Sequence, residues 1–329
     1  FLLFFSVAIN HYYAGRGAFP IDTFLHFDPG FRILNGEHPF TDFWLVSGLV
    51  VNYMQAIFFS IFGVNWHSYV IHASLMNGFL TVSTFLILEN FKLKSDFCFL
   101  YALFFSILAY PSSGTPFVDY HSAFFSLIAI YCLLLAIDTN KKLYWSFISI
   151  FLGLAFFSKQ VPASYVILSI LIILILYSFK KRNTEYISYF LLGAVIFIFF
   201  AFAFGFIARI DFTSFLQQYI FYPLTIGSNR FENLAFSYRG IIDHFKFIYL
   251  AIIPFLYINL RKINNEKNYL ASNDFFIFIS LFSLTISLIF HQLLTLNQTF
   301  IFFLIPILSG FSHISFINLN FKYKNIFNF

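Results

Sequence analysis

The chain alternates between long apolar runs and short polar segments, and many of the runs have the length of membrane-spanning helices. A helix needs about 20 apolar residues to cross roughly 30 Å of hydrocarbon. With an opening run at 1–14, the pattern predicts an all-α, polytopic membrane helical bundle of about ten transmembrane helices, folded as one domain over residues 1–329. The other predicted spans are 66–90, 96–111, 121–138, 143–158, 162–179, 186–208, 246–260, 274–291 and 298–316.

Basic residues between the runs indicate which way each helix crosses. They form five clusters: Lys92/Lys94, Lys141/Lys142, Lys180/Lys181/Arg182, Arg261/Lys262/Lys267 and Lys322/Lys324. Two predicted spans lie between consecutive clusters each time, so all five clusters fall on the same side of the membrane. Loops on the cytoplasmic side carry an excess of Lys and Arg, so this side is predicted to be cytoplasmic.

One further apolar run, "GLVVNYMQAIFFSIFG" at 48–63, does not fit this alternation. If the first helix runs outward, residues 15–65 all lie outside, and 48–63 is an amphipathic or re-entrant helix in the outer leaflet. A crossing helix here would place the opening segment inside, unless a missing N-terminus adds a span. The opening run "FLLFFSVAIN" is too short to cross, so we expect the N-terminus to be truncated.

Composition supports a membrane protein and excludes a soluble one. The chain is 60% hydrophobic and 10% charged, with a mean hydropathy of +0.82, whereas soluble domains are about 25% charged. The formal charge of +5 comes from clusters between the spans, so no nucleic-acid partner is expected. Cys98 and Cys132 lie inside apolar runs, which favours buried packing over a disulfide or a zinc site.

Polar residues concentrate in the predicted outer segments, and the span centres lack Asp, Glu, Lys and Arg. Asn77 is the main polar side chain near a span centre, with His72 nearer the outer end. Ion-coupled transporters use polar sites at the midplane, and ionised groups there mark transport routes. Any chemistry is therefore expected at the outer interface.

The outer face offers both residue types that group transfer from a phosphate needs. A carboxylate can take the proton of an acceptor hydroxyl, and a cation can stabilise a phosphate leaving group. Lys159 stands out because it breaks the positive-inside rule on a short hairpin tip. The alternative is a snorkelling lysine bound to membrane lipid phosphate. The outer carboxylates are Asp22, Asp28, Asp42 and Asp119, and the outer cations are Lys159, Arg209, Arg230 and Arg239.

Several of these residues also have structural interpretations. Asp28 precedes Pro29 and could be a helix N-cap, and Asp42 and Asp119 could cap the helices that follow them. His121 lies beside Asp119 in "VDYHS". The histidines show no metal-binding spacing. The cofactor stays unknown: a divalent metal is compatible with the acidic residues, and nothing in the sequence requires one.

The pattern as a whole resembles the GT-C superfamily of polytopic glycosyltransferases, which includes protein O-mannosyltransferases and aminoarabinose lipid A transferases. The similar features are an outward first helix, an acidic first loop, "RILNGEHPFTDF" (32–43), a juxtamembrane helix ending in "FFSIFGVN" (58–65), and "GLAFFSKQVPA" (153–163). The likeness in sequence covers about residues 10–165. The remainder of the chain resembles the superfamily mainly in its topology.

The resemblance implies transfer of a sugar from a polyprenyl-phosphate donor to a lipid, glycan or protein acceptor, with inversion. It places the protein in a bacterial inner membrane with the active site facing the periplasm. Asp22 falls at the family's acidic position, the general base, but Thr23 stands where many members have Glu, so Asp28 remains an alternative. Lys159 would contact the donor phosphate, with Asp42, Asp119, His121, Arg230 and Arg239 as further substrate-binding candidates.

Two other classes remain open from the sequence. A transporter or flippase for lipid-linked saccharides would share the basic and aromatic outer loops, but should have a polar central cavity. A non-catalytic membrane assembly protein would not need the outer acidic residues.

Overall fold

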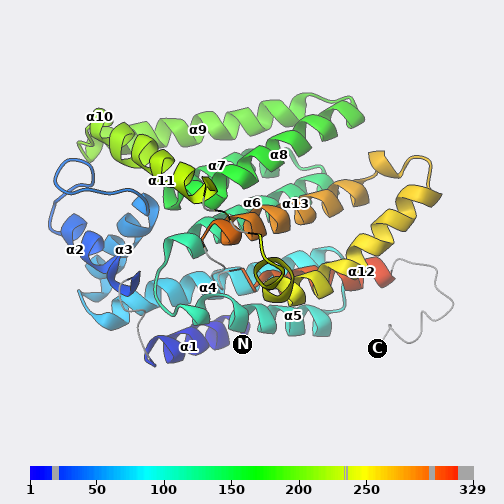
Figure 1. The fold of residues 1–329 in the computed structure, drawn as a ribbon, viewed down its shortest axis with the longest axis horizontal. Helices are drawn as coiled ribbons and strands as arrows, with labels where there is room; N and C mark the ends of the chain where they lie inside the picture. Colours follow the sequence, from blue (N-terminus) through cyan, green and yellow to red (C-terminus); the bar gives the residue numbers. More distant parts are fainter. Residues whose placement is uncertain (17–21, 233, 235, 296–300, 318–329) are drawn as a thin grey trace.

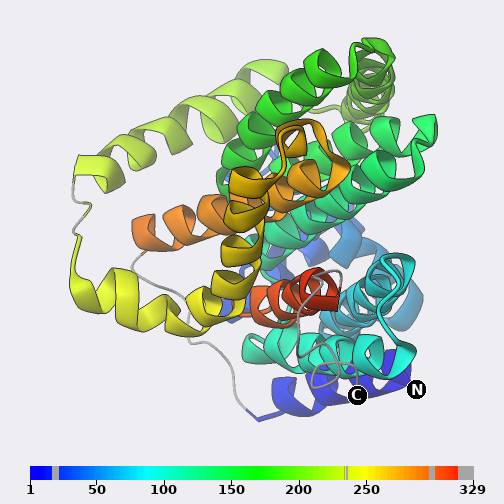
Figure 2. The ribbon, with the colours of Figure 1, turned by 90° about the vertical axis from the view of Figure 1, so that its right-hand side faces the viewer.

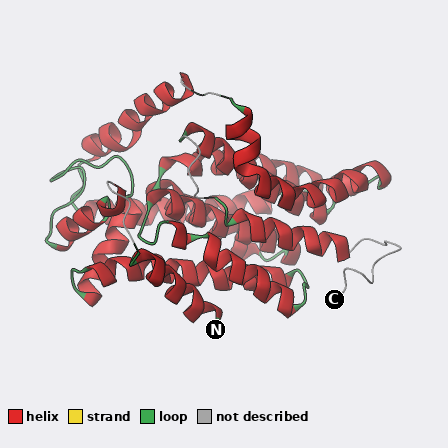
Figure 3. Ribbon diagram, turned by 60° about the horizontal axis from the view of Figure 1, so that its bottom comes forward, coloured by secondary structure: helices red, strands yellow, loops and turns green. Residues whose placement is uncertain are grey.

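The computed structural model describes residues 1–16, 22–232, 234, 236–295 and 301–317, which form helices and connecting loops. Figure 1 shows the helices gathered into an elongated bundle, and Figure 3 shows how short most of the connections are. The helices are α1 (Leu2–Ala14), α2 (Phe27–Leu34), α3 (Leu49–Phe62), α4 (Trp66–Asn90), α5 (Ser95–Leu108), α6 (Val118–Thr139), α7 (Lys142–Ser158), α8 (Gln160–Lys181), α9 (Glu185–Ile207), α10 (Phe212–Phe215), α11 (Tyr222–Glu232), α12 (His244–Asn265), α13 (Asn273–Leu294) and α14 (Leu304–Ile317).

Helix lengths and hydropathy make the chain a polytopic helical membrane protein. Within the described residues, seven helical stretches are long and apolar enough to cross a membrane, and they include α4, α6, α8, α9 and α13. Every apolar run in the sequence corresponds to a helix, although residues 298–300 of the last run lie outside the described ranges. Because α1, α7 and α14 are shorter, the total near ten stays a prediction.

Helix α3 lies with α2 at one end of the bundle, beside the start of α4 (Figure 1). Its 14 residues span about 21 Å at 1.5 Å per residue, which is less than the hydrocarbon thickness of about 30 Å. Helices α1 and α14 are no longer than α3, so the placement of α3 in the outer leaflet stays a prediction. We call this end of the bundle the α3 end.

The basic clusters of the described chain meet at the opposite end, which we call the lysine end. Asn90 after α4 donates to Asp138 of α6 over 3.0 Å, and Asn273 of α13 donates to the Ile137 carbonyl over 2.9 Å. Lys142 and Glu185 form an ion pair that joins α7 to α9. The described clusters therefore share one end of the bundle, and the side of the membrane that this end faces stays a prediction. Lys322 and Lys324 lie outside the described residues.

Helix α6 forms the centre of the bundle and is buried along nearly its whole length. It packs against α7, α8 and α13, and this leaves α9 at the edge of the bundle (Figure 2). The rings of Phe199 and Phe206 on α9 are exposed. Gly193 of α9 allows close contact with α7, because an added Cβ would lie 2.0 Å from the Ser146 carbonyl oxygen. Small residues permit such close helix packing in membranes.

Candidate functional site

A buried carboxylate at the α3 end joins three segments that are distant in the sequence. Asp119, in the first turn of α6, accepts hydrogen bonds from the Lys159 ammonium at 2.8 and 2.7 Å, one on each oxygen. The same Oδ1 also accepts from His291 Nε2 of α13 at 2.7 Å. Asp119 and His291 are almost fully buried, whereas the Lys159 side chain is 20% exposed. The ammonium therefore reaches the edge of the buried cluster.

The loop that carries Lys159 is fixed from several sides. Lys159 has an extended backbone between α7 and α8, and its carbonyl accepts from the Ser122 hydroxyl of α6 at 3.0 Å. The amide of Gly48, just before α3, donates to the Ser158 carbonyl at 2.8 Å. Gln160 donates to the Val46 and Tyr219 carbonyls. These contacts hold the ammonium against Asp119.

A chain of neutral side chains links α6 to α3 beside this ion pair. His72 of α4 is bonded to Gln55 Oε1 at 2.9 Å and to His121 Nε2 at 3.0 Å, and His121 Nδ1 is bonded to the Tyr110 hydroxyl. Because an amide oxygen only accepts, His72 Nδ1 donates to Gln55. His121 Nε2 then donates to His72, and Tyr110 donates to His121. His121 thus anchors α3 through His72.

The first loop reaches the same region through His26. Its Nδ1 lies 2.6 Å from Asn52 Oδ1 of α3. The pKa of His26 is lowered to about 4, mainly by burial and to a smaller extent by Lys159. The hydrogen bond to Asn52 and the charge of Asp119 raise this pKa, but their effect is smaller than that of burial. The ring is therefore neutral near pH 7. A Cβ built on Gly48 would lie 2.8 Å from the His26 ring and 2.9 Å from Val118 Cγ1, so the loop between α1 and α3 packs against the residue next to Asp119.

Several buried polar atoms around this cluster have no hydrogen-bond partner among the described residues. Two are acceptors if the rings are neutral: His26 Nε2 and His291 Nδ1. Two are donors on successive turns of α3, Asn52 Nδ2 and Gln55 Nε2. Buried polar groups in folded proteins are nearly always paired, so a set of unpaired ones marks a place where a polar ligand or water completes the bonding.

Comparison with known proteins gives the family. The model of the family described as dolichyl-phosphate-mannose-protein mannosyltransferase matches residues 38–204, just over half of the chain. The chain belongs to this family. It is a GT-C membrane glycosyltransferase family, as the sequence resemblance predicted, and its members use polyprenyl-phosphate sugar donors. No curated protein and no solved structure matches the chain.

In this glycosyltransferase, the two predicted catalytic acids have different surroundings. Asp28 is exposed and forms an ion pair with Arg32 at 3.1 Å; it does not cap α2, which begins one residue earlier, at Phe27. Asp22 is half-buried at the start of a 3-10 turn, Asp22–Phe24. No hydrogen bond or ion pair joins its carboxylate to another described residue.

The other predicted binding residues lie on several separate elements of the glycosyltransferase. Asp119 and Lys159 come together, although the sequence did not pair them. Asp42 is exposed and accepts the His38 amide at 2.7 Å; it does not cap α3, whose N-cap is Gly48. Exposed Arg230 of α11 is near enough to act electrostatically on His291. Exposed Arg239 begins a π-helical turn before α12, and nothing in the structure joins it to Asp119.

Several residues of this region could hardly be predicted from the sequence. His291 follows a long apolar run and is next to Gln292 in the sequence. These two adjacent polar residues are the local signal of a polar helix end. Nothing nearby in the sequence connects it to Asp119. Among the described residues, no group of three or more His, Cys, Asp or Glu side chains is arranged to hold a metal ion.

Proposed function

We propose that the enzyme transfers its sugar at the α3 end, with Lys159 binding the donor phosphate and Asp22 acting as general base. The basic clusters support an outer location for this end, which in a bacterial inner membrane is the periplasmic side. The observation that carries the proposal is the Lys159 ammonium, held by both oxygens of buried Asp119 and still partly exposed.

Lys159 has the donors and the position for a phosphate ligand. An ammonium has three N–H donors, and Asp119 occupies two of them. The third is free for a phosphate oxygen. When the bond between the sugar and the phosphate oxygen breaks, the leaving polyprenyl phosphate gains negative charge, which a fixed cation stabilises. Asp119 and His291 keep that cation in place.

Asp22 is the better of the two candidate bases. In an inverting transfer the acceptor hydroxyl attacks the anomeric carbon as the phosphate leaves, and a carboxylate takes the hydroxyl proton. The Asp28 carboxylate is already paired with Arg32, and Asp119 accepts three charge-assisted hydrogen bonds. Asp22 carries no such partner among the described residues.

The unpaired polar atoms near the ion pair support a sugar ligand. Asn52 and Gln55 offer N–H donors, while His26 and His291 offer ring-nitrogen acceptors. A sugar hydroxyl both donates and accepts, so a hydroxyl-rich ligand can satisfy this mixed set. A phosphate, which mainly accepts, would use the donors alone.

Sugar transfer from a polyprenyl-phosphate donor in reconstituted membranes tests these roles. Asp22→Asn should lower turnover by about 100-fold or more, the usual contribution of a general base. Lys159→Ala should cause a loss of similar order, and Asp28→Asn should retain most activity. Lys142→Ala, at the lysine end, is the matched control for Lys159. Full activity in both Asp22→Asn and Lys159→Ala would refute the assignment.

A further inference from the structure

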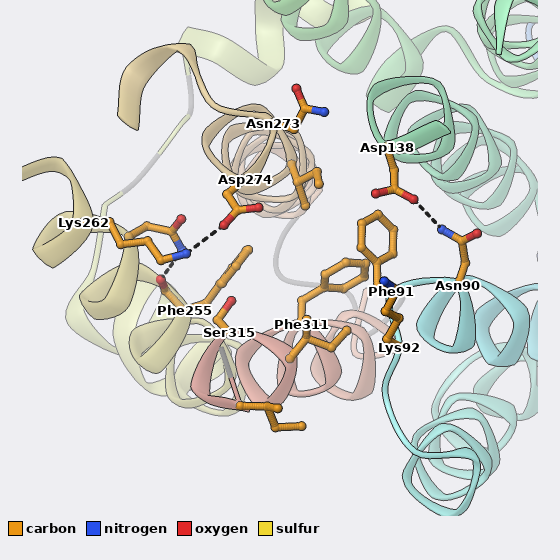
Figure 4. A pocket seen from close by; sticks show the side chains of 14 residues that line it. Asn90, Phe91, Lys92, Asp138, Phe255, Lys262, Asn273, Asp274, Phe311 and Ser315 are labelled. Carbon is orange, nitrogen blue, oxygen red and sulfur yellow. Dashed lines mark hydrogen bonds and ion pairs between the residues drawn. The ribbon is translucent and has the colours of Figure 1, made fainter. Parts of the chain in front are cut away.

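A pocket lies at the lysine end, remote from the Asp119 cluster. It encloses about 410 Å³ between the ends of α4, α6, α12, α13 and α14 (Figure 4). Small-molecule sites usually have volumes of about 300–1,000 Å³. Asp119 and Asp138 are 19 residues apart on α6, which corresponds to about 28 Å along the helix. The pocket is therefore separate from the proposed transfer site.

The pocket has an apolar floor and a polar mouth. Phe255 and Phe311 are 3% and 2% exposed, and with Phe91 they place aromatic rings at its centre (Figure 4). The mouth is formed by exposed side chains that include Lys92 and Asp138. A ligand that fits must therefore combine an apolar part with a polar head.

Each side of the pocket carries one positive and one negative charge. On the α12–α13 side, Lys262 and Asp274 form an ion pair at 2.8 Å. On the α4–α6 side, Asp138 accepts a hydrogen bond from Asn90 at 3.0 Å, and Lys92 extends from the loop after α4 (Figure 4). The formal charge of the four groups sums to zero, so a ligand with both signs of charge is complemented better than an anion or a cation.

The depth of the pocket matches that of a lipid headgroup. Its lining on α12 runs from Phe255 to Lys262, and this helix ends at Asn265. The pocket thus lies within about 15 Å of the helix end, a depth that covers the headgroup layer and the first part of the acyl chains. Membrane lipids of the leaflet at the lysine end are the amphiphiles present there.

We propose that this pocket binds a phospholipid whose zwitterionic headgroup combines a phosphate with a primary ammonium, as in phosphatidylethanolamine. Lys92 and Lys262 attract the phosphate, and the free oxygen of Asp138 accepts from the ammonium. The start of an acyl chain covers Phe255 and Phe311. A quaternary ammonium has no N–H to donate to Asp138, and the two carboxylates disfavour a headgroup with net negative charge.

Lipid titrations of the full chain in detergent test the site by native mass spectrometry. Short-chain phosphatidylethanolamine should bind more tightly than phosphatidylglycerol or phosphatidylcholine with the same chains. Equal affinity for the three lipids would overturn the proposal. Titration with free phosphoethanolamine tests whether the acyl chain contributes to binding. If phosphoethanolamine binds as tightly as the lipid, the acyl chain contributes nothing and the lipid assignment is refuted.

Two variants connect the binding to this pocket. Asp138→Asn should weaken phosphatidylethanolamine binding about ten- to hundredfold, the range for a hydrogen bond to a charged group. Ser315→Trp should block the pocket by filling it. Glu185→Gln, at the same end but outside the pocket, is the control and should leave binding unchanged. Unaltered lipid affinity in both pocket variants, with unchanged thermal unfolding, would show that the lipid binds elsewhere.

Discussion

At the scale of single residues, Asp119 holds the α3 end together. Its carboxylate is buried and joins Lys159 and His291, which come from elements 40 and 172 residues away in the sequence. A buried ion pair is weak as a source of net stability, but the loss of one partner leaves an uncompensated charge in a low-dielectric setting and costs about 3–5 kcal/mol. The pair therefore constrains which substitutions the site accepts.

Asp119→Asn should lower the free energy of unfolding by about 3 kcal/mol or more, because Lys159 and His291 lose their anion. The double variant Asp119→Asn/Lys159→Gln removes both charges and should recover part of the stability while transfer stays low. Thermal unfolding in detergent and the transfer assay measure the two effects. A single variant as stable as the wild type would contradict the role of this pair.

His26 makes stability depend on pH. Its folded pKa of about 4 lies below the ordinary value of 6.5, so the unfolded chain binds this proton first as pH falls. The contribution of neutral His26 to the free energy of unfolding is fully present above about pH 6.5 and is lost as pH falls towards 4. The loss amounts to about 3 kcal/mol for this pKa shift. His26→Gln should flatten the unfolding free energy over that window. An unchanged pH profile in the variant would exclude His26 as its source.

At the scale of elements, polar side chains fix helices to one another inside the bundle. Asn77 of α4 donates to the carbonyls of Ser6 in α1 at 3.2 Å and Ser106 in α5 at 2.9 Å. Its oxygen accepts from the Tyr110 amide at 3.3 Å. The most polar residue near a predicted span centre is thus a structural one, and it holds α1 and α5 against α4.

Asn77→Ala should lower the free energy of unfolding by about 1–2 kcal/mol, since polar groups of α1 and α5 lose their partner. Ser83→Ala is the control on the same helix, because its exposed hydroxyl bonds only to Phe79 one turn back. It should change stability by less than about 0.5 kcal/mol. Equal effects of the two substitutions in thermal unfolding would exclude interhelical bonding by Asn77.

Helix positions were largely predictable from the sequence, whereas the site was predictable only in part. Apolar runs specify helices because backbone groups in lipid must bond within their own segment. Asp119 and Lys159 were singled out by charge, but their contact with His291 depends on how α6, α8 and α13 pack. Helices α10 and α11 lie between the predicted spans 186–208 and 246–260, where no helix was predicted.

At the scale of the whole molecule, the two ends differ in chemistry. The α3 end holds the buried ion pair and the neutral histidines, and the lysine end holds the basic clusters and the lipid pocket proposed above. From the positive-inside rule we expect the lysine end to face the cytoplasm. The central helix α6 runs between the two ends, from Asp119 to Asp138.

Cysteine labelling in cells tests this orientation. Asn35→Cys at the α3 end should react with a membrane-impermeant maleimide, and Thr184→Cys at the lysine end should react only after permeabilisation. Both positions are exposed, while the native Cys98 and Cys132 are buried and should stay silent. Labelling of both introduced cysteines from the same side would contradict the alternating topology.

The spread of the Asp119 cluster along the chain has a consequence for biosynthesis. Asp119 and Lys159 belong to α6 and the α7–α8 hairpin, so they can pair and neutralise one another soon after these helices leave the ribosome. His291 emerges much later, near the end of α13. A nascent chain therefore carries Lys159 and Asp119 as a pair early, but it completes the three-residue cluster only after α13 has been synthesised and inserted.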